Sequence, residues 1–484
     1  MTNAVIVGAG PNGLAAALFL ADHDIEVTIL EANSSIGGGA RSGEYTLPGL
    51  THDHCSAFHP FGVGSSFWKE VELEKYGLEW AWSEVDCAHP LDDGRAGILY
   101  RSLDKTVEHL GVDGDIWRKI VGSNVRNFDL LAEDIFRPLL HIPQHPVTLA
   151  KFAPYASLPA STLMRMFKTE AGKALFGGIA AHAFTSLDRP LTASLGIMLA
   201  AAAHQWGWPV AKGGSGAIVA ALEKALTQKN VTIHTNSPVI SKRDIPTADL
   251  VLLDLSPQQI LSLYGDEMPS RIKKQYSNFR SGSSAFRVDY AISGDIPWKN
   301  SHCRRAGTVH LGGNAKETLL SESLRAKGKM PSRPFVLVGQ QYIADPARSN
   351  GNLNPIYAYA HVPKGCSGDA TGLVTEQIER FAPGFRDQIV MSKSINPQQM
   401  ESSNRNFHNG DIIGGENDGL QLVFRPRMTT NPYWIGVQGV YICSHSSPPG
   451  AGVHGLCGKN AATAAFRDLQ KRIHSLKQIT LCSA

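Results

Sequence analysis

Apolar and polar positions in the first thirty residues follow first the pattern of a strand, then that of a helix, then that of a strand again. Residues 4–7 (AVIV) are all apolar, residues 14–21 form an apolar run of helical length, and residues 26–30 (EVTIL) return to a strand pattern. This order predicts a strand, a helix and a second strand, which together form a βαβ unit. We therefore expect an α/β protein.

Three glycines and one acidic residue occupy the positions at which such a unit binds a dinucleotide. Gly8 allows a tight turn, Gly10 lets the backbone approach a pyrophosphate, and Gly13 lets the helix pack against the sheet. The first helical turn then presents its free N–H groups to phosphates. Glu31 ends the second strand, where a carboxylate accepts hydrogen bonds from ribose hydroxyls. The predicted cofactor-binding residues of this unit are Gly8, Gly10, Pro11, Asn12, Gly13, Glu31 and Ala32.

A second glycine-rich loop favours FAD over NAD as the dinucleotide. Residues 37–42 read GGGARS, and the chain then continues into residues 47–52 rather than into further alternating strands and helices. This order resembles the FAD-binding domain of the glutathione-reductase and amine-oxidase type, in which the loop covers the flavin phosphates and ribityl chain. The resemblance implies cofactor contacts from Gly38, Gly39 and Arg41. Gly39 stands where the usual loop carries its arginine.

A middle segment is expected to return to the FAD domain. It has an amphipathic helix over residues 217–228 and strands at 231–234 and 250–254, with Val239 between the strands. The Gly213–Gly216 cluster precedes this helix. Because no apolar strand leads into the cluster, we interpret it as a structural turn and not as a second nucleotide loop. The chain therefore has no NAD(P)H site that the sequence reveals.

The last segment combines a buried strand at 440–444, a loop of prolines and glycines at 445–452, and a helix from 453 to about 472. A helix N-terminus carries roughly half a positive charge. Directed at the pyrimidine end of the flavin, it would stabilise the anionic reduced form. The later segments add six predicted cofactor-binding residues, which are Val239, Cys443, Ser444, Gly450, Gly452 and Val453.

Composition and charge restrict the class of protein. The chain has 484 residues, enough for roughly two to three domains, and 43% of them are apolar. A net charge of +3 without a long basic run argues against nucleic acid. The first strand starts at residue 4 and the longest apolar stretch, near 195–203, is short, so we expect neither a signal peptide nor a transmembrane segment. We expect a cytoplasmic protein, with peripheral membrane contact left open.

Three long segments resemble phytoene-desaturase-like FAD-dependent oxidoreductases. They are VIVGAGPNGLAAALFLA near the start, GWPVAKGGSGAIVAAL in the middle and GVYICSHSSPPGAGVHGLCGKNAATAA near the end. Shorter segments such as HDHCSAFHPF (52–61) and GDIIGG (410–415) are similar to the same group, so the resemblance covers essentially the whole chain. It implies non-covalent FAD and a second domain whose sheet covers the flavin. The group contains desaturases, isomerases and saturases.

This resemblance leads us to predict a discontinuous layout. A Rossmann-like FAD-binding domain would comprise residues 1–62, 205–275 and 430–484, and an α+β substrate domain would comprise 63–204 and 276–429. Helical patterns in the substrate domain lie near 115–135, 160–166 and 191–204. Strand patterns lie at 285–292, 307–311, 335–341 and 356–362.

Histidines beside the expected flavin loops are the candidates for catalytic residues. A proton acceptor is useful if the substrate loses a C–H proton together with a hydride. We predict this role for His59 and His445, with His361 as a further candidate. The cluster of His52, His54, Cys55 and His59 has neither a carboxylate nor a second cysteine spaced to complete a metal shell, so we expect no metal. Cys443 is interpreted as a packed strand residue.

The first functional hypothesis is an FAD-dependent dehydrogenase or desaturase that transfers a hydride from a C–H bond of a largely apolar small molecule to flavin N5. An amine or amino-acid oxidase is the redox alternative, but Cys443 and Ser444 stand where that pattern has Gly-Asp. A flavin-dependent isomerase, and a flavoprotein that acts through a partner, are further alternatives. Oxygen or a quinone is the expected electron acceptor, in preference to NAD(P).

Overall fold

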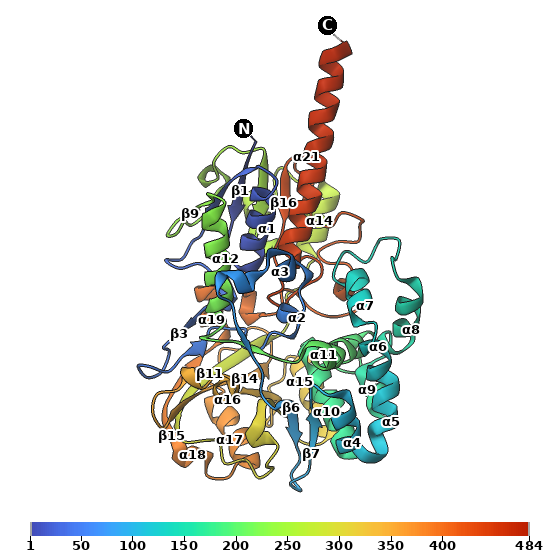
Figure 1. Ribbon diagram of the computed structural model, residues 1–484, viewed down its shortest axis with the longest axis vertical. Coiled ribbons are helices and arrows are strands. Elements are labelled where there is room, and N and C mark those ends of the chain that lie inside the picture. The colour runs from blue at the N-terminus through green and yellow to red at the C-terminus, as the bar shows by residue number, and fades with distance from the viewer. Residues whose placement is uncertain (1, 483–484) are drawn as a thin grey trace.

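The computed structural model describes residues 2–482, whose longer strands form two separate sheets (Figure 1). The first sheet has five parallel strands in the order β16–β10–β1–β2–β9. The bounds of these strands are β1 (Asn3–Val7), β2 (Glu26–Leu30), β9 (Thr232–His234), β10 (Leu250–Leu253) and β16 (Val440–Ile442). Each matches a strand predicted from the sequence, and the α/β fold with a Rossmann-like sheet is confirmed.

Helices cover both faces of this sheet, which explains why its strands are unbroken apolar runs. Ala4 and Ile6 of β1 pack with α1 (Pro11–Ala21), α12 (Gly216–Gln228) and α21 (Leu456–Cys482). Val5 and Val7 point to the opposite face, where α13 (Pro257–Tyr264) and α14 (Ser270–Ser277) lie. This alternation follows from the two-residue period of a strand.

The second sheet has seven strands in the order β15–β11–β14–β13–β12–β6–β7, and all neighbours are antiparallel except β12 and β6. The bounds are β6 (Val85–Pro90), β7 (Ala96–Leu99), β11 (Ser284–Ser293), β12 (Ala306–Leu311), β13 (Val336–Gly339), β14 (Leu353–Val362) and β15 (Ile389–Ile395). The four predicted strands are present. The sequence analysis missed β6 and β7, and also β15, a mostly exposed edge strand without apolar alternation.

The two faces of the seven-stranded sheet differ in chemistry. One face carries aliphatic side chains such as Val309 and Val338 and packs against α17 (Thr371–Phe381). The other face carries Thr308, Tyr357 and Tyr359, which line a cavity. This second face is therefore the one that contributes to a binding site.

A helical layer lies beside the seven-stranded sheet, at the lower right of Figure 1. Its helices are α4 (Leu103–Leu110), α5 (Gly114–Trp117), α6 (Ser123–Val125), α7 (Phe128–Ile135), α8 (Pro146–Ala156), α9 (Ala160–Met164), α10 (Glu170–Ala180), α11 (Thr192–Trp206) and α15 (Ala315–Ala326). The helix predicted over 115–135 is interrupted by a π-helical segment at Arg118–Gly122 and a break before Phe128. The predicted helical pattern near 115–135 is therefore confirmed, as several helical segments whose apolar side chains belong to one core.

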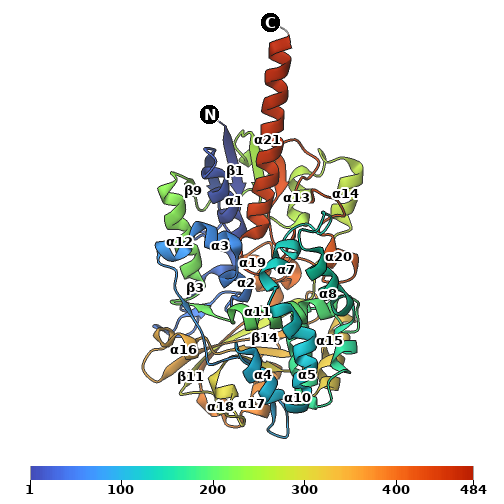
Figure 2. The same cartoon turned by 45° about the vertical axis from the view of Figure 1, so that its right-hand side comes forward.

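Helix α21 extends past the rest of the molecule, as Figures 1 and 2 both show. It begins at Leu456, so the predicted start at Val453 was three residues too early. Val453 has a φ of +52°, outside helical geometry. A Cβ at Gly458 would lie 1.8 Å from the Asn12 carbonyl oxygen, so glycine lets α21 pack directly on the first turn of α1.

Short elements connect these layers. They are β3 (Ser42–Gly43), β4 (His52–Asp53), β5 (Trp80–Ala81), β8 (Val210–Ala211), α2 (Pro60–Val63), α3 (Ser66–Val71), α16 (Gln341–Ala344), α18 (Phe385–Gln388), α19 (Pro397–Ser403) and α20 (Leu420–Val423). The strands of the first sheet lie within 1–62, 205–275 and 430–484, while the domain boundaries themselves stay a prediction. No helix within residues 2–482 combines the length and the hydropathy needed to cross a bilayer.

Candidate functional site

One cavity, about 900 Å³ in volume, is lined by residues from both sheets. Part of its wall is formed by the glycine turn, Glu31 and Asp254, which follow the carboxyl ends of β1, β2 and β10. Another part is formed by α8 and α11 of the helical layer. Ligands of open parallel sheets bind beyond the carboxyl ends of the strands, so the first part occupies the position of a nucleotide site.

Backbone, and not side chains, forms the surface of the glycine turn. Gly8 has a φ of +98°, a conformation that favours glycine. A Cβ at Gly13 would lie 2.0 Å from the Gly8 carbonyl oxygen, and a Cβ at Gly10 would lie 2.6 Å from Asp254 Oδ2. Side chains are therefore excluded at all three positions. Of the predicted residues in this turn, Gly13 does not line the cavity, whereas four do: Gly8, Gly10, Pro11 and Asn12.

Glu31 is held at the cavity wall next to this turn. Its carboxylate accepts hydrogen bonds from the backbone N–H of Ala9 at 2.8 Å and from that of Asn33 at 2.9 Å. Ala32 and Val239 line the same region. The carboxylate is thus fixed where it can accept hydrogen bonds from the hydroxyls of a ligand.

Asp254 is a site residue that the sequence analysis did not single out. It is buried, and its Oδ2 accepts a hydrogen bond from the backbone N–H of Gly13 at 3.1 Å. Burial raises the pKa of Asp254 to about 7; the Gly13 hydrogen bond opposes this shift and the Glu31 charge adds to it. The sequence signal that could have indicated Asp254 is its position as an acidic residue directly after an apolar strand. Its charge state affects how the turn receives an anionic ligand.

The second glycine loop lies against the first. A Cβ at Gly38 would be 3.2 Å from the Cα of Gly10. A Cβ at Gly39 would be 2.9 Å from a ring carbon of Phe407, so the aromatic ring occupies the space that a larger residue would need. Gly38 and Gly39 line the cavity, and Arg41 does not. The Arg41 guanidinium instead donates to the Gly38 carbonyl oxygen at 2.8 Å and so stabilises the loop.

The loop before α21 forms another part of the wall, and it contains three of the predicted residues. Gly450, Gly452 and Val453 all line the cavity, and both glycines have positive φ values. The Val453 carbonyl oxygen accepts a hydrogen bond from the Trp68 indole at 2.9 Å, which anchors the loop. The backbone N–H of Leu456, at the start of the helix, donates a hydrogen bond to His454 Nδ1 at 3.0 Å.

Cys443 and Ser444 precede this loop and do not line the cavity. Both are fully buried, and burial raises the pKa of the Cys443 thiol well above its usual range. The backbone N–H of Cys443 continues the sheet by donating to Leu253 at 2.9 Å. These two residues are therefore part of the buried core next to the loop and not of the cavity wall.

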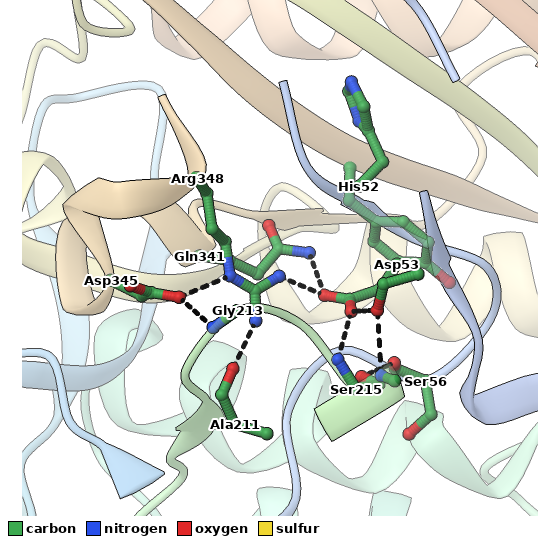
Figure 3. Close-up of polar contacts among 12 residues, drawn as sticks. His52, Asp53, Ser56, Ala211, Gly213, Ser215, Gln341, Asp345 and Arg348 are labelled. Carbon is green, nitrogen blue, oxygen red and sulfur yellow. Dashed lines mark hydrogen bonds and ion pairs between the residues drawn. The ribbon is translucent and has the colours of Figure 1, made fainter. Parts of the chain in front are cut away.

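His59 lies in a buried polar network and does not line the cavity. Its Nε2 lies 2.9 Å from the Ser215 hydroxyl, and burial lowers its pKa to about 4. In the same network Arg348 pairs with Asp53 at 2.5 Å, and the Ser215 backbone N–H donates to Asp53 at 2.7 Å (Figure 3). Asp345 accepts from the Gly213 backbone N–H at 2.8 Å. This geometry favours a structural role for His59.

The Gly213–Gly216 turn is part of that network. Asp345 and Asp53 bind its backbone N–H groups, and α12 begins at Gly216. The two-residue strand β8 before it pairs with β5 and not with the parallel sheet. The interpretation as a structural turn is therefore confirmed.

His445, in contrast, lines the cavity. Its Nε2 is buried and has no hydrogen-bond partner among the described residues, and burial lowers its pKa to about 4. His361 lies on β14 beside Glu322, with its Nδ1 2.9 Å from the carboxylate, and it does not line the cavity. Within residues 2–482 no group of three or more His, Cys, Asp or Glu side chains is arranged to hold a metal ion.

The wall formed by α8 and α11 is mainly apolar. Leu149, Phe152, Leu195 and Met198 belong to it, together with Phe61 of α2. His182, after α10, and Arg425, after α20, are among the polar residues of the cavity wall that were not predicted from the sequence. A lone charge within the apolar segment LVFRP (422–426) was the signal for Arg425.

Comparisons with known proteins agree with this architecture. The family described as "NAD(P)-binding Rossmann-like domain" matches residues 6–71, which include the glycine turn and Glu31. The mouse "Pyridine nucleotide-disulfide oxidoreductase domain-containing protein 2" is 24% identical over 97% of this chain and 94% of its own length. The "Phytoene desaturase (lycopene-forming)" of a Paracoccus species is 23% identical over 95% of this chain and 96% of its own length.

Solved structures share the whole fold. An oxidoreductase from Methanosarcina mazei superposes with a TM-score of 0.63 at 16% identity, covering 96% of this chain and 100% of its own. Cyclohexylamine oxidase from Brevibacterium oxydans superposes with a TM-score of 0.59 at 14% identity, covering 97% and 99%. The arrangement of both sheets is therefore one that known oxidoreductases also have.

Proposed function

We propose that this protein is an FAD-dependent oxidoreductase that takes a hydride from a C–H bond of a largely apolar small molecule, as a dehydrogenase or desaturase. The observation that carries the proposal is that one and the same cavity is lined by a dinucleotide-type glycine turn and by an apolar wall. The names of the relatives and of the structural neighbours, all oxidoreductases, support the reaction class.

The residues present fit FAD. The glycine turn presents free backbone where a Cβ would clash, which is the surface that a pyrophosphate needs. Glu31 would bind the adenosine ribose, the turn and Gly38 would face the phosphates, and the Gly450–Val453 loop would lie against the ring system. When bound, FAD supplies a hydride acceptor at N5. The protein's part is to place the substrate and exclude water.

The cavity wall supports an apolar substrate. Burial of apolar surface is worth roughly 25 cal/mol per Å², so the α8 and α11 side chains would bind a hydrocarbon segment without polar contacts. His445 lines the cavity, and its buried Nε2 has no hydrogen-bond partner among the described residues, so it could accept a hydrogen bond or a proton. His445 thus remains the better placed of the two predicted catalytic histidines.

The electron acceptor is proposed to be oxygen or a quinone. Asp345 and Asp53 bind the N–H groups of the Gly213–Gly216 turn, so this turn is not free to bind a nicotinamide nucleotide. Cys443 and Ser444 depart from the Gly-Asp pattern of amine oxidases, which weighs against that alternative. The phytoene-desaturase-like assignment remains part of this proposal.

Purification with analysis of the bound cofactor tests the proposal. We expect a yellow protein that releases unmodified FAD on denaturation, with little bleaching of the flavin by NADH or NADPH. The matched control is Gly10→Val, whose side chain would displace Asp254 and leave the protein without flavin. Untargeted comparison of metabolites exposed to the wild-type and control proteins would then identify the substrate. A colourless wild-type protein that FAD cannot reconstitute would contradict the proposal.

A further inference from the structure

Four arginine side chains are buried among the residues that the structure describes, and three of them are paired with a carboxylate. Arg287 pairs with Asp289, Arg325 pairs with Glu322 at 2.7 Å, and Arg348 pairs with Asp53 at 2.5 Å. Such pairing is the rule, because an unpaired charge in the protein interior costs several kcal/mol. These three pairs are therefore complete structural units.

Arg425 is the fourth, with 3% of its surface exposed, and it lacks such a pair. Within the described part of the chain no carboxylate lies within 4 Å of its guanidinium. Its Nη2 donates to the Asn417 amide oxygen and its Nη1 to the Ile413 carbonyl oxygen at 3.4 Å, while Nε has no acceptor. Burial lowers the pKa of Arg425, and the charge of Asp411 opposes this shift.

Asp411 does not replace the missing partner. Its carboxylate oxygens are occupied by the backbone N–H groups of Gly282 at 2.6 Å, Gly415 at 2.7 Å and Ile413 at 2.9 Å. The negative charge of Asp411 raises the pKa of Arg425, but the two side chains form no ion pair. Arg425 is therefore a buried guanidinium with an unused Nε–H group, to which an anionic ligand could bind.

The position of Arg425 identifies where that anion would lie. Arg425 lines the cavity, and its Nη1 is 3.4 Å from the place of a Cβ on Gly450, in the loop proposed to contact the flavin ring. Asn417, which accepts from Arg425, donates to the Ala183 carbonyl oxygen at 3.2 Å. Ala183 follows His182, which lines the cavity. Arg425 and Asn417 thus link the cofactor loop to the wall of the substrate region.

We propose that Arg425, with Asn417 beside it, binds a carboxylate carried by the substrate, so that the substrate is an amphipathic acid. This inference rests on the proposed function of the same cavity. A carboxylate compensates the guanidinium charge throughout the reaction. The pyrimidine of an oxidised flavin is neutral and would leave that charge uncompensated before reduction. Planar, bidentate contact with a carboxylate is the geometry that a guanidinium favours.

Binding of two probes of equal chain length tests the inference. Dodecanoate and 1-dodecanol are titrated into the flavin-loaded protein, with calorimetry and flavin absorbance as readouts. We expect the wild-type protein to prefer dodecanoate. Arg425→Gln should weaken dodecanoate binding on the order of 100-fold and leave dodecanol within about twofold, because charge-assisted hydrogen bonds are lost. Arg425→Lys should give an intermediate loss, since it keeps the charge without the fork.

The control is Arg118→Gln, which removes a charge from an exposed arginine and should change neither affinity. The flavin midpoint potential of each variant is measured as well. An unchanged dodecanoate affinity in Arg425→Gln would overturn the inference, and a lower potential in that case would assign Arg425 to the flavin. Equal affinity of the wild-type protein for the two probes would also overturn it. Calorimetry measures dodecanoate binding without a flavin signal. A colourless protein would therefore contradict the proposed function, while the inference about Arg425 could still be tested.

Discussion

Arg348 and Arg425 are both buried, yet they belong to regions that differ in one physical respect. Around Arg348 every strong donor has an acceptor: the guanidinium contacts Asp53, Asp345 and the Ala211 carbonyl oxygen, and both carboxylates also bind backbone N–H groups (Figure 3). Around Arg425 the guanidinium borders a cavity and has no ion-pair partner among the described residues. A saturated network serves the fold, whereas an unsaturated one is available to a ligand.

The contrast extends to the two predicted catalytic histidines. His59 belongs to the saturated network through Ser215, and His445 belongs to the cavity with an unpartnered Nε2. Both are held neutral by burial, which lowers each pKa to about 4. Accessibility and hydrogen bonding, and not the titration of the ring, therefore separate the two residues.

The largest expected effect is on stability and breaks the saturated network. Arg348→Gln leaves two buried carboxylates without their cation, and removal of one partner of a buried pair costs about 3–5 kcal/mol. Arg425→Gln removes a charge that has no partner, so the free energy of unfolding should change by less than about 1 kcal/mol or rise. Chemical denaturation of both variants without cofactor measures this difference. Equal losses would mean that the two arginines have the same structural role.

The next effect is on cofactor binding at the glycine-turn end of the cavity. Glu31→Ala should weaken FAD binding about 10- to 150-fold, because hydrogen bonds to a charged group are worth about 1.5–3 kcal/mol. Fluorescence titration with FAD measures the affinity. The rate at which substrate reduces the reconstituted flavin should stay near that of the wild type, since the adenosine is remote from N5. A slow reduction rate in fully loaded Glu31→Ala would contradict this separation of roles.

A smaller effect concerns pH and Asp254. Its pKa in the folded protein, about 7, is above the ordinary carboxyl value of about 4. Stability from its protonated form is therefore present below about pH 4 and is lost as pH rises through about 7. FAD phosphates would repel the ionised form, so FAD affinity should fall up to about fivefold between pH 7 and pH 8.

Asp254→Asn is the matched test, because the amide keeps the shape of the side chain and cannot ionise. FAD affinity of this variant should be nearly constant between pH 6 and pH 8, as measured by fluorescence titration. The Glu31→Ala protein serves as the comparison and should keep a pH dependence that is shifted to lower pH, because the Glu31 charge contributes to the raised pKa of Asp254. A wild-type affinity that does not vary over this range would show that Asp254 does not titrate next to the phosphates.

The last expected effect is catalytic and compares the two histidines. His445→Asn should slow substrate-driven flavin reduction about tenfold or more, in keeping with the contribution of a positioned proton acceptor. His59→Asn should reduce at nearly the wild-type rate and lose some stability, since it removes a bond to Ser215. Single-turnover absorbance measures both rates. If His445→Asn also reduces at the wild-type rate, placement of the substrate, and not proton transfer, accounts for catalysis.

Local sequence was sufficient to predict the nucleotide-type part of the cavity wall. Gly8, Gly10, Gly13 and Glu31 lie close together along the chain, and each has a local requirement: a positive φ, a close backbone approach or the end of a strand. Local requirements of this kind leave a readable pattern. The parallel strands could also be predicted from the sequence, because burial on both faces makes them continuous apolar runs.

The other parts of the site depend on contacts between residues that are distant in the chain. Arg425 is separated by 242 positions from Ala183, with Asn417 bridging the two, and no short pattern records such a contact. The edge strand β15 has too little burial to produce alternation, and the polar side chains of β6 conceal its buried position. Whether a histidine or arginine is paired or open to a cavity depends on partners distant in the chain. Pairing across the fold, and not residue type, therefore separates the side chains with complete contacts from those that a ligand could contact.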